Sequence, residues 1–382
     1  MSDFEFREPA VVSEELRMLR DQARRFVKDV VEPHHKHSTR SSNRNKTMNT
    51  VERTKGNLIA SALVCCAVVF QPTANAADAN ANLEPNRDQP MINPAASAQQ
   101  ATTITLLGTM GGPPEDPSGR RAQSSTLLTV NGVHYLIDAG DGVVSRLIKA
   151  GVPPYTVRKV FLTHRHLDHT AGLTAFMSQS WFNGWFFRDK YYMDRSTTKP
   201  FVEIYGPPDT STLFEGSMKF LSVLARDTDA PAFGTMKLPP EVFSVRTIEK
   251  PGAFFNDGTV KVTAIENTHF GIPMPGPIAK NGDFSFAYRF DTPSGSVVFT
   301  GDSGPSENIT KLAEGADVLV SEVLDFKLLT TESREGVGIT KAPNPEQIRF
   351  RMKQQHLSPE EVGKMAAKAG VKLVILSHVV PG

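Results

Sequence analysis

Residues 163–173 are the most informative stretch of this chain, and they read Thr163-His164-Arg165-His166-Leu167-Asp168-His169-Thr170-Ala171-Gly172-Leu173. Three histidines and one aspartate fall within six residues, directly after the apolar residues 159–163, which are typical of a buried strand. Imidazole and carboxylate are the ligands that Zn²⁺ prefers when thiolates are absent. Histidine is scarce, with 10 in 382 residues, so a chance match would occur on the order of once in several thousand chains. The stretch predicts a metal-binding loop rather than a solvated polar loop.

Four more polar side chains stand where other elements begin or end. His269, Asp302 and His378 each end an apolar run that predicts a strand, and His356 directly precedes the helix start at residues 357–361. Functional sites in α/β sheets are assembled from residues at the carboxyl ends of separate strands. Together with the first motif, these positions indicate one shared site.

From residue 102 onward, strands and helices alternate in the pattern of an α/β protein. Asn131-Gly132 is a hairpin signal between two of the strands. A helix is expected directly after the histidine motif. Strands in two groups with interspersed helices predict an αββα sandwich of two mixed sheets flanked by helices. Strands are predicted at residues 102–107, 125–130, 133–138, 159–163, 202–205, 260–267, 285–290, 296–300, 318–322 and 373–377, and further helices at 143–150, 210–226, 308–314 and 359–369.

The first hundred residues do not read as one functional unit. Residues 13–33 have apolar positions at helical spacing and resemble the opening helix of acyl-CoA dehydrogenases, but nothing downstream continues that resemblance. We expect residues 1–47 to be an extraneous or fused leader, consisting of this helix and a disordered segment. Residues 77–101 are rich in Ala, Asn, Gln and Pro and predict a disordered linker.

Residues 48–76 have the pattern of a secretory signal peptide. Arg53 and Lys55 precede the apolar residues 58–70, and Ala74-Asn75-Ala76 offers a cleavage site. The apolar run is too short to span a membrane, so no membrane span is expected after its removal. If Met48 is the true start, the protein is exported, to the periplasm or beyond the cell. N-terminal sequencing of the natively secreted protein tests this, and a mature chain that keeps residues 1–47 would refute it.

Charge and cysteine content narrow the function classes. Residues 1–76 carry 12 Lys/Arg and 9 Asp/Glu, which leaves 30 and 32 for the remainder, a net charge of −2. Proteins that bind a phosphate backbone usually show a basic surplus, so nucleic acid is not an expected partner. The two cysteines, Cys65 and Cys66, lie inside the predicted signal peptide. A disulfide framework and a cysteine-ligated zinc site are therefore excluded for the remaining chain.

From about residue 102 to the C-terminus, the chain resembles the metallo-β-lactamase superfamily. Within that superfamily it is similar to the ribonuclease Z-like branch, which includes phosphodiesterases and a zinc-dependent alkylsulfatase/arylsulfatase group. The matching elements are Leu107-Gly108-Thr109, Asp138-Ala139-Gly140, the motif from His164 to His169, Ile204-Tyr205-Gly206-Pro207, Thr268-His269, Phe286-Ala287-Tyr288-Arg289, Thr300-Gly301-Asp302-Ser303, Ser321-Glu322, His356-Leu357-Ser358 and Leu376-Ser377-His378.

The resemblance implies a dinuclear zinc hydrolase that uses a metal-bridging hydroxide, with Mn²⁺ or Fe²⁺ as an alternative ion in one position. It assigns His164, His166 and His269 to the first ion, Asp168, His169 and His378 to the second, and Asp302 to both. Asp168 would also orient the attacking hydroxide. His356 would protonate or stabilise the departing oxygen, and Glu322 would orient the His356 ring.

Three features set the chain apart from tRNA-processing members of that branch. The hairpin at residues 291–295 leaves no room for the tRNA-gripping arm that many bacterial members carry there. The working part of the chain is not basic, and a signal peptide would export the protein away from tRNA. The chain also stops four residues after His378, so we expect a C-terminally truncated domain.

The favoured interpretation is therefore an exported hydrolase of small phosphodiester or sulfate esters. Its partner would be a small-molecule ester, and a homodimer is compatible with the sequence. The aromatic stretch from Trp181 to Tyr192 either packs over the core or lines the mouth of the site. Two alternatives stay open: a lactone or β-lactam ring hydrolase, and a catalytically inert zinc-binding domain.

Overall fold

A computed structural model of the chain describes residues 102–112, 119–194, 196–197, 199–227, 236–271, 283–326 and 344–380. The predicted leader (1–47) with its helix at 13–33, the signal peptide (48–76) and the linker (77–101) lie outside the described residues. Among the described residues, no helix combines the length and the apolar composition that crossing a membrane requires.

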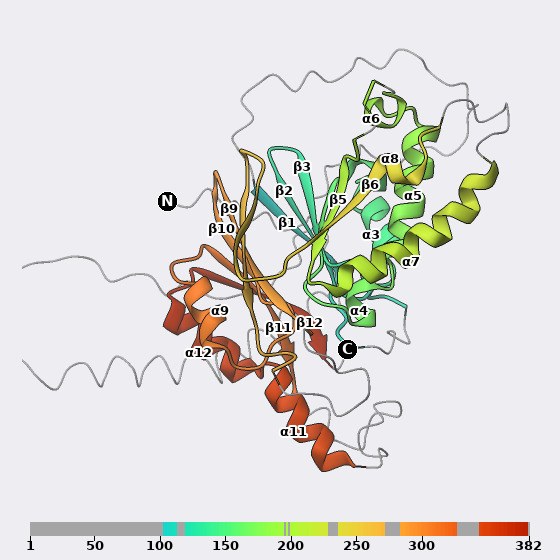
Figure 1. The fold of residues 1–382 in the computed structure, drawn as a ribbon. Coiled ribbons are helices and arrows are strands. Elements are labelled where there is room, and N and C mark those ends of the chain that lie inside the picture. The colour runs from blue at the N-terminus through green and yellow to red at the C-terminus, as the bar shows by residue number, and fades with distance from the viewer. Residues whose placement is uncertain are drawn as a thin grey trace, which may run out of the picture.

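Two six-stranded mixed sheets face each other (Figure 1). In the first sheet β1, β2 and β3 are antiparallel neighbours and β3 to β6 run parallel. In the second sheet β7 to β10 are antiparallel neighbours and β10 to β12 run parallel. The first sheet contains β1 (Thr102–Gly108), β2 (Ser125–Val130), β3 (Val133–Ile137), β4 (Lys159–Phe161), β5 (Val202–Gly206) and β6 (Phe243–Thr247). The second contains β7 (Gly252–Asn256), β8 (Lys261–Glu266), β9 (Phe286–Thr292), β10 (Gly295–Phe299), β11 (Val318–Leu324) and β12 (Leu373–Val380).

Helices cover the outer face of each sheet (Figure 1). The first sheet is covered by the helices α3 (Val143–Lys149), α4 (Leu167–Thr170), α5 (Leu173–Phe186), α6 (Lys190–Met193), α7 (Asp209–Leu224) and α8 (Pro239–Val242). The second carries α9 (Glu307–Leu312) and α12 (Pro359–Ala369), and α11 (Pro345–Gln355) extends from the end where the β10 and β11 loops lie. The resulting four layers confirm the predicted αββα sandwich.

Three apolar clusters hold the layers together. One lies between the first sheet and its helices, a second between the two sheets, and a third between the second sheet and α9 and α12. Phe161 of β4 lies in the cluster between the two sheets. Its ring packs edge-on against Phe290 and stacks on Tyr205, with ring centroids 5.1 Å apart in both pairs. Because β4 is fixed from both sheets, the histidine motif that follows it starts from a rigid position.

The structure contains elements that the sequence pattern does not predict. The strand β6 is an edge strand of the first sheet, and β7 is an edge strand of the second. Both are short and only partly buried. The helix α11 also has no helical apolar stripe, because Ile348, Phe350 and Met352 are spaced two residues apart. Its start is instead marked by a cap, in which the Asn344 side chain accepts a hydrogen bond from the Gln347 amide.

Candidate active site

The histidine motif follows β4 and is hydrogen-bonded to Asp138 at the end of the neighbouring strand β3. Asp138 follows β3 with a left-handed φ of 59°, a conformation that Asp adopts more readily than most residues. Its Oδ1 accepts a hydrogen bond from the Thr163 amide at 2.8 Å, and its Oδ2 accepts one from Nδ1 of His169 at 2.8 Å. Asp138 therefore links Thr163 and His169, near the two ends of the motif, without the help of a bound metal ion.

The first group of ligand atoms comes from both sheets. Nδ1 of His166 lies 3.0 Å from Nε2 of His164 and 3.0 Å from Nε2 of His269. His164 and His166 leave β4, whereas His269 follows β8 of the other sheet. An oxygen of Asp302, after β10, lies 3.9 Å from Nε2 of both His164 and His269. These four side chains could hold one metal ion.

The second group shares Asp302 with the first. Oδ1 of Asp302 lies 3.1 Å from Nε2 of His169, and Oδ2 lies 3.2 Å from Nε2 of His378. Nε2 of His378 also lies 3.0 Å from Oδ2 of Asp168. Within each group the ligand atoms all lie within 4.8 Å of one another. The structure thus brings together all seven side chains that the sequence predicts as metal ligands.

The chemistry of the first group fits a cation at its centre. Nδ1 of His164 donates to the Thr163 hydroxyl at 3.0 Å, because that hydroxyl gives its own proton to Asp138. Nδ1 of His269 donates to the Gln355 carbonyl at 3.0 Å. With these protons on Nδ1, both Nε2 atoms present lone pairs to the same nitrogen of His166. That nitrogen carries at most one proton, so it can donate to only one of them. Ligands at about 2.0–2.1 Å from a tetrahedral Zn²⁺ lie ~3.3 Å apart, close to the observed separation.

The second group fits a cation for a separate reason. Nε2 of His169 and Oδ1 of Asp302 are buried and lie 3.1 Å apart, but neither makes a hydrogen bond among the described residues, since the His169 proton is on Nδ1, which donates to Asp138. A buried polar atom without a partner carries a desolvation cost, which coordination of a metal ion would remove. A group of imidazole and carboxylate donors without thiolates is a donor set for a divalent cation such as Zn²⁺.

Burial and neighbouring charges keep most of these ligands in the form that binds metal. Burial lowers the pKa of His269 to about 3 and places the pKa of His164 well below its usual value. Burial alone would raise the pKa of Asp168, but His169 and His378 hold it below its usual range. Neutral imidazoles and ionised carboxylates are the states in which these side chains coordinate.

A β-bulge aims His378 into the site. Ser321 of β11 pairs with Leu376 of β12, and Val323 pairs with Val379, so Glu322 faces two residues of β12. His378 is one of those two, and its φ is 45°. Bulges beside active sites commonly redirect a side chain, and here the bulge turns both Glu322 and His378 toward the ligand groups.

His356 and Glu322 form a buried pair beside the ligands. Nδ1 of His356 donates to Oε2 of Glu322 at 2.8 Å, and the other oxygen of Glu322 accepts the Ser303 amide hydrogen bond. The His356 ring centre lies 5.0 Å from that of His269 and 6.1 Å from that of His378. Burial alone would lower the pKa of His356, but the Glu322 carboxylate raises it to about 9. The imidazole is thus held as a proton donor next to the two ligand groups.

Residues 134–379 match the sequence profile of the Beta-lactamase superfamily domain. The chain belongs to the metallo-β-lactamase superfamily. Ribonuclease Z of Mycolicibacterium gilvum (strain PYR-GCK) is 30% identical over 283 residues, which cover 73% of this chain and 84% of that protein. Ribonuclease Z of Mycobacterium sp. (strain KMS) is 29% identical over 281 residues with the same coverage. The solved structure of the short form of human tRNase Z is 20% identical, with a TM-score of 0.49, and covers 73% of this chain and 92% of that one.

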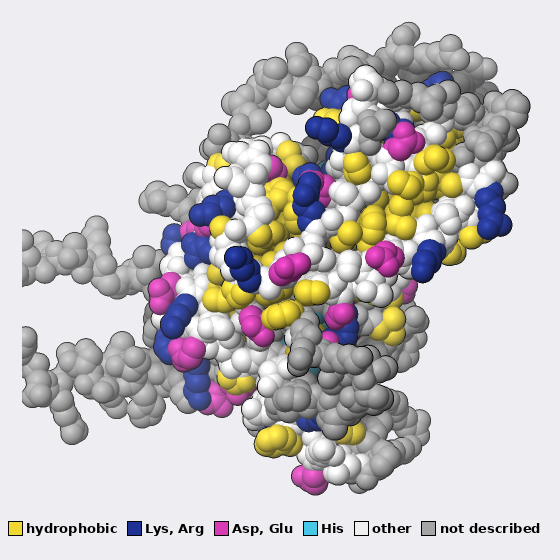
Figure 2. All heavy atoms as spheres, in the orientation of Figure 1, with side chains coloured by type: hydrophobic (Ala, Val, Ile, Leu, Met, Phe, Trp, Pro, Cys, Tyr) yellow, Lys and Arg dark blue, Asp and Glu magenta, His cyan; other side chains and the backbone are white. Residues whose placement is uncertain are grey.

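These metallo-β-lactamase relatives correct one prediction. The expectation of a small-molecule ester partner and no nucleic acid is wrong, because the relatives are named for an RNA-cleaving activity and match over 84% of their length. The net charge of −2 misled because it omits any bound cations, which are often the largest local charges in a site. Figure 2 shows basic and acidic side chains interspersed over the described part of one face. The net charge of this domain therefore does not separate it from relatives named Ribonuclease Z.

Several contacts in this metallo-β-lactamase site could not be predicted from the sequence. The amide of Gly112 donates to Oδ2 of Asp168 at 2.8 Å, and Gln355 holds His269 through its backbone carbonyl. Backbone groups leave no trace in residue type. Asp138 lies in a stretch that carries the family resemblance and Thr163 directly precedes another, but the sequence indicates no role for either of them.

Part of the aromatic stretch from Trp181 to Tyr192 packs between the first sheet and the helices that cover it. Trp181 and Tyr192 are buried, and Trp181 donates to the Lys237 carbonyl at 2.7 Å. Phe186 and Phe187 are exposed at the end of α5, a 14-residue helix that spans about 21 Å. Figure 1 shows α6 at the opposite end of this layer from α4, which carries Asp168 and His169. The packing interpretation of this stretch therefore holds for its buried members.

Proposed function

We propose that the protein is a phosphodiesterase that cleaves RNA strands with the help of two divalent cations, zinc in the first instance. One observation carries the proposal: the two ligand groups share Asp302 and lie beside the His356–Glu322 pair. A site that only binds a metal structurally needs no proton donor. The choice of RNA is supported by the relatives named Ribonuclease Z, one of them 30% identical.

The ligand groups divide between the two cations. His164, His166 and His269 would hold one, and Asp168, His169 and His378 would hold the other, with Asp302 contributing to both. When bound, such a pair of cations lowers the pKa of water and neutralises the charge that develops on the phosphoryl oxygens. The positions of the ligands are fixed beforehand by their outer contacts to Asp138, Thr163 and Gln355.

Two side chains would then handle protons. Asp168 has one oxygen held by the Gly112 amide at 2.8 Å, and its carboxylate would accept a hydrogen bond from the attacking water and orient it. His356 would donate the proton from Nε2 to the departing ribose oxygen, because its Nδ1–H is committed to Glu322. Glu322 acts through His356 and is a positioning residue.

The proposal is tested on the purified full-length chain. Zinc is measured by plasma emission, and cleavage is assayed on a single-stranded RNA, a precursor tRNA, bis-p-nitrophenyl phosphate, p-nitrophenyl sulfate, a homoserine lactone and nitrocefin. We expect cleavage of RNA and of the phosphate diester, lost on chelation and restored by Zn²⁺. Preferential turnover of the sulfate, the lactone or nitrocefin would replace the proposal, and a fully zinc-loaded protein that turns over no substrate would favour the inert domain.

A further inference from the structure

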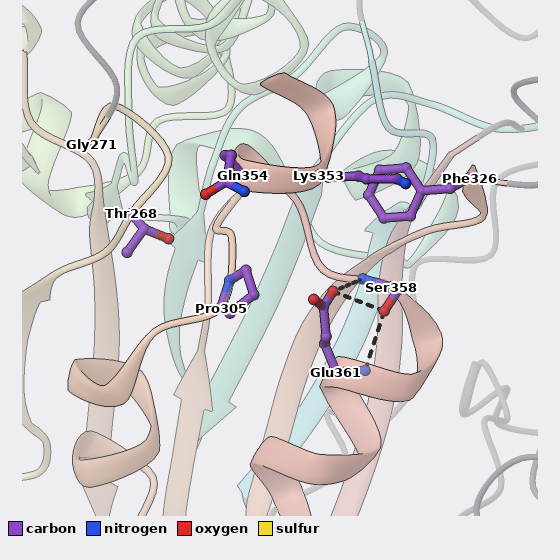
Figure 3. Close-up of a pocket in the computed structure, with 8 residues that line it drawn as sticks. All are labelled: Thr268, Gly271, Pro305, Phe326, Lys353, Gln354, Ser358 and Glu361. Carbon is purple, nitrogen blue, oxygen red and sulfur yellow. Dashed lines mark hydrogen bonds between the residues drawn. The ribbon is translucent and has the colours of Figure 1, made fainter. Parts of the chain in front are cut away.

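A pocket of about 540 Å³ lies at the end of the second sheet, outside the ligand groups (Figure 3). Its walls come from the segment after β8, the loop before α9, the end of β11, and the junction between α11 and α12. Its volume falls within the range of about 300–1,000 Å³ that is usual for small-molecule sites. The function proposed above does not use this pocket.

Two of the residues that line the pocket lie close to active-site residues in the sequence. Thr268 lines it and directly precedes the ligand His269, and Gln354 lines it two residues before His356. Between them, Nδ1 of His269 donates to the carbonyl of Gln355 at 3.0 Å. Two stretches of backbone, linked by this hydrogen bond, therefore each carry a pocket-lining residue close to a residue of the candidate active site.

The lining offers three kinds of contact. Phe326 presents an aromatic ring, and Lys353 supplies the cationic side chain. Figure 3 shows the Thr268 hydroxyl, the Gln354 amide and the Glu361 carboxylate directed toward the middle of the pocket. Glu361 is held in place because its Oε2 accepts hydrogen bonds from the amide and hydroxyl of Ser358, both at 2.8 Å.

We propose that this pocket is a subsite for one unpaired nucleotide of the RNA strand, next to the bond that is cleaved. The base stacks on Phe326, its polar edge meets Gln354 and Glu361, and Lys353 contacts a neighbouring phosphate. Aromatic rings, a nearby cation and groups that contact the base edge are the means by which proteins hold single-stranded RNA. This inference rests on the proposed RNA cleavage.

An unpaired nucleotide fits this pocket better than a base pair does. A base within a helix is stacked on both faces and cannot enter a concave site without leaving the helix, whereas an unpaired base is free to do so. The described part of the face in Figure 2 intersperses both signs of charge. Local contacts of this kind would then contribute binding affinity that a broad basic surface contributes in other nucleic-acid-binding proteins.

The test uses full-length variants with two substrates. Phe326→Ala, Phe326→Leu and Lys353→Met are assayed on a single-stranded RNA and on bis-p-nitrophenyl phosphate, which has no nucleotide to place in the pocket. Phe350→Ala is the matched aromatic control, because Phe350 is exposed on α11 and does not line the pocket. Lys311→Met is the matched control for the lysine, since Lys311 is exposed on α9 and does not line it either.

We expect Phe326→Ala to raise KM for RNA on the order of tenfold, since stacking on one ring contributes on that scale, with kcat unchanged. Phe326→Leu keeps the apolar volume but not the stacking and should raise KM in the same direction. Lys353→Met should raise KM and reduce the slope of log KM against log salt by about 0.7, the value for one phosphate contact on a single strand. Turnover of the small diester should stay at the wild-type rate in all three variants.

Different results would overturn the RNA-cleaving function and the nucleotide subsite. A wild-type protein that hydrolyses the small diester but cleaves no RNA would overturn the proposed function, and the subsite with it. RNA cleavage with an unchanged KM in Phe326→Leu and Lys353→Met would overturn the subsite alone. Equal losses on both substrates in these two variants would also overturn it, because they would show that the pocket supports the metal centre rather than the strand.

Discussion

Nε2 of His378 lies 3.0 Å from Oδ2 of Asp168, although the two residues are 210 positions apart in the chain. Asp168 follows β4 of the first sheet and His378 lies in β12 of the second. The contact therefore joins the two sheets at the metal centre. Any change that moves β12 at its bulge should affect the second ligand group before the first.

Gly111→Ala should impair the second ligand group selectively. A Cβ at Gly111 would lie 2.5 Å from Nδ1 of His378, closer than real contacts allow, so the ring must move. We expect bound metal to fall to about one ion per chain and diester hydrolysis to fall at least tenfold. Gly216→Ala is the control, because a Cβ there meets open space on α7, and alanine favours a helix. Equal metal contents in the two variants would contradict this prediction.

His356→Ala should slow turnover without removing metal. Loss of a general acid typically costs on the order of 10²–10⁴-fold in rate, and His356 lies outside both ligand groups. Metal content by plasma emission should match the wild type. If the variant loses zinc, His356 serves the ligand set instead of the departing oxygen.

Glu322→Gln should lower kcat for a different reason. Glu322 orients His356 and keeps it protonated through a 2.8 Å hydrogen bond, and an amide keeps the shape but removes the charge. We expect a loss on the order of tenfold, as for other outer contacts to a site, with KM near the wild-type value. The basic limb of the pH–rate profile should move to lower pH, and an unmoved limb would show that Glu322 does not control the His356 proton.

Glu203→Gln should reduce stability at neutral pH but not in acid. Burial alone would raise the pKa of Glu203, yet hydrogen bonds from Lys159, Tyr205 and Arg246 lower it overall. A carboxyl whose pKa is lower in the folded state stabilises the fold above its unfolded value of about 4.3, and this contribution is lost as pH falls through the folded value.

Solvent screens this partly exposed group, so we expect a loss of about 1 kcal/mol or less at pH 7. Urea unfolding at pH 7 and at pH 3 measures the difference between Glu203→Gln and the wild type. A difference of the same size at both pH values would show that the charge of Glu203 is not responsible.

The sequence predicts the layers and the ligand positions because both follow from regular patterns. His269 and Asp302 could be placed because each ends an apolar run, and the ends of strands meet at one edge of a sheet. The His164–His169 motif could be placed because its spacing is rare. These signals lie in short stretches of sequence, so they can be recognised without knowing which strands pair.

Other features depend on pairing between distant segments and have no local signal. The bulge that turns His378 inward is a property of the register between β11 and β12, and neither strand shows it alone. The pocket beside Thr268 arises only when the end of α11 packs against the loop after β8. The expectation of no nucleic-acid partner, which the relatives named Ribonuclease Z contradict, relied partly on net charge, and net charge averages over the chain instead of describing the charges at one site.

Whether the site holds two cations is measured by the metal content of the purified full-length chain. We expect two zinc ions per chain in the wild type, and less than about one in Asp302→Ala, because the two ligand groups share that carboxylate. A wild-type protein that binds no more than one ion at saturating zinc would contradict the two-cation site. So would an Asp302→Ala variant that still holds two.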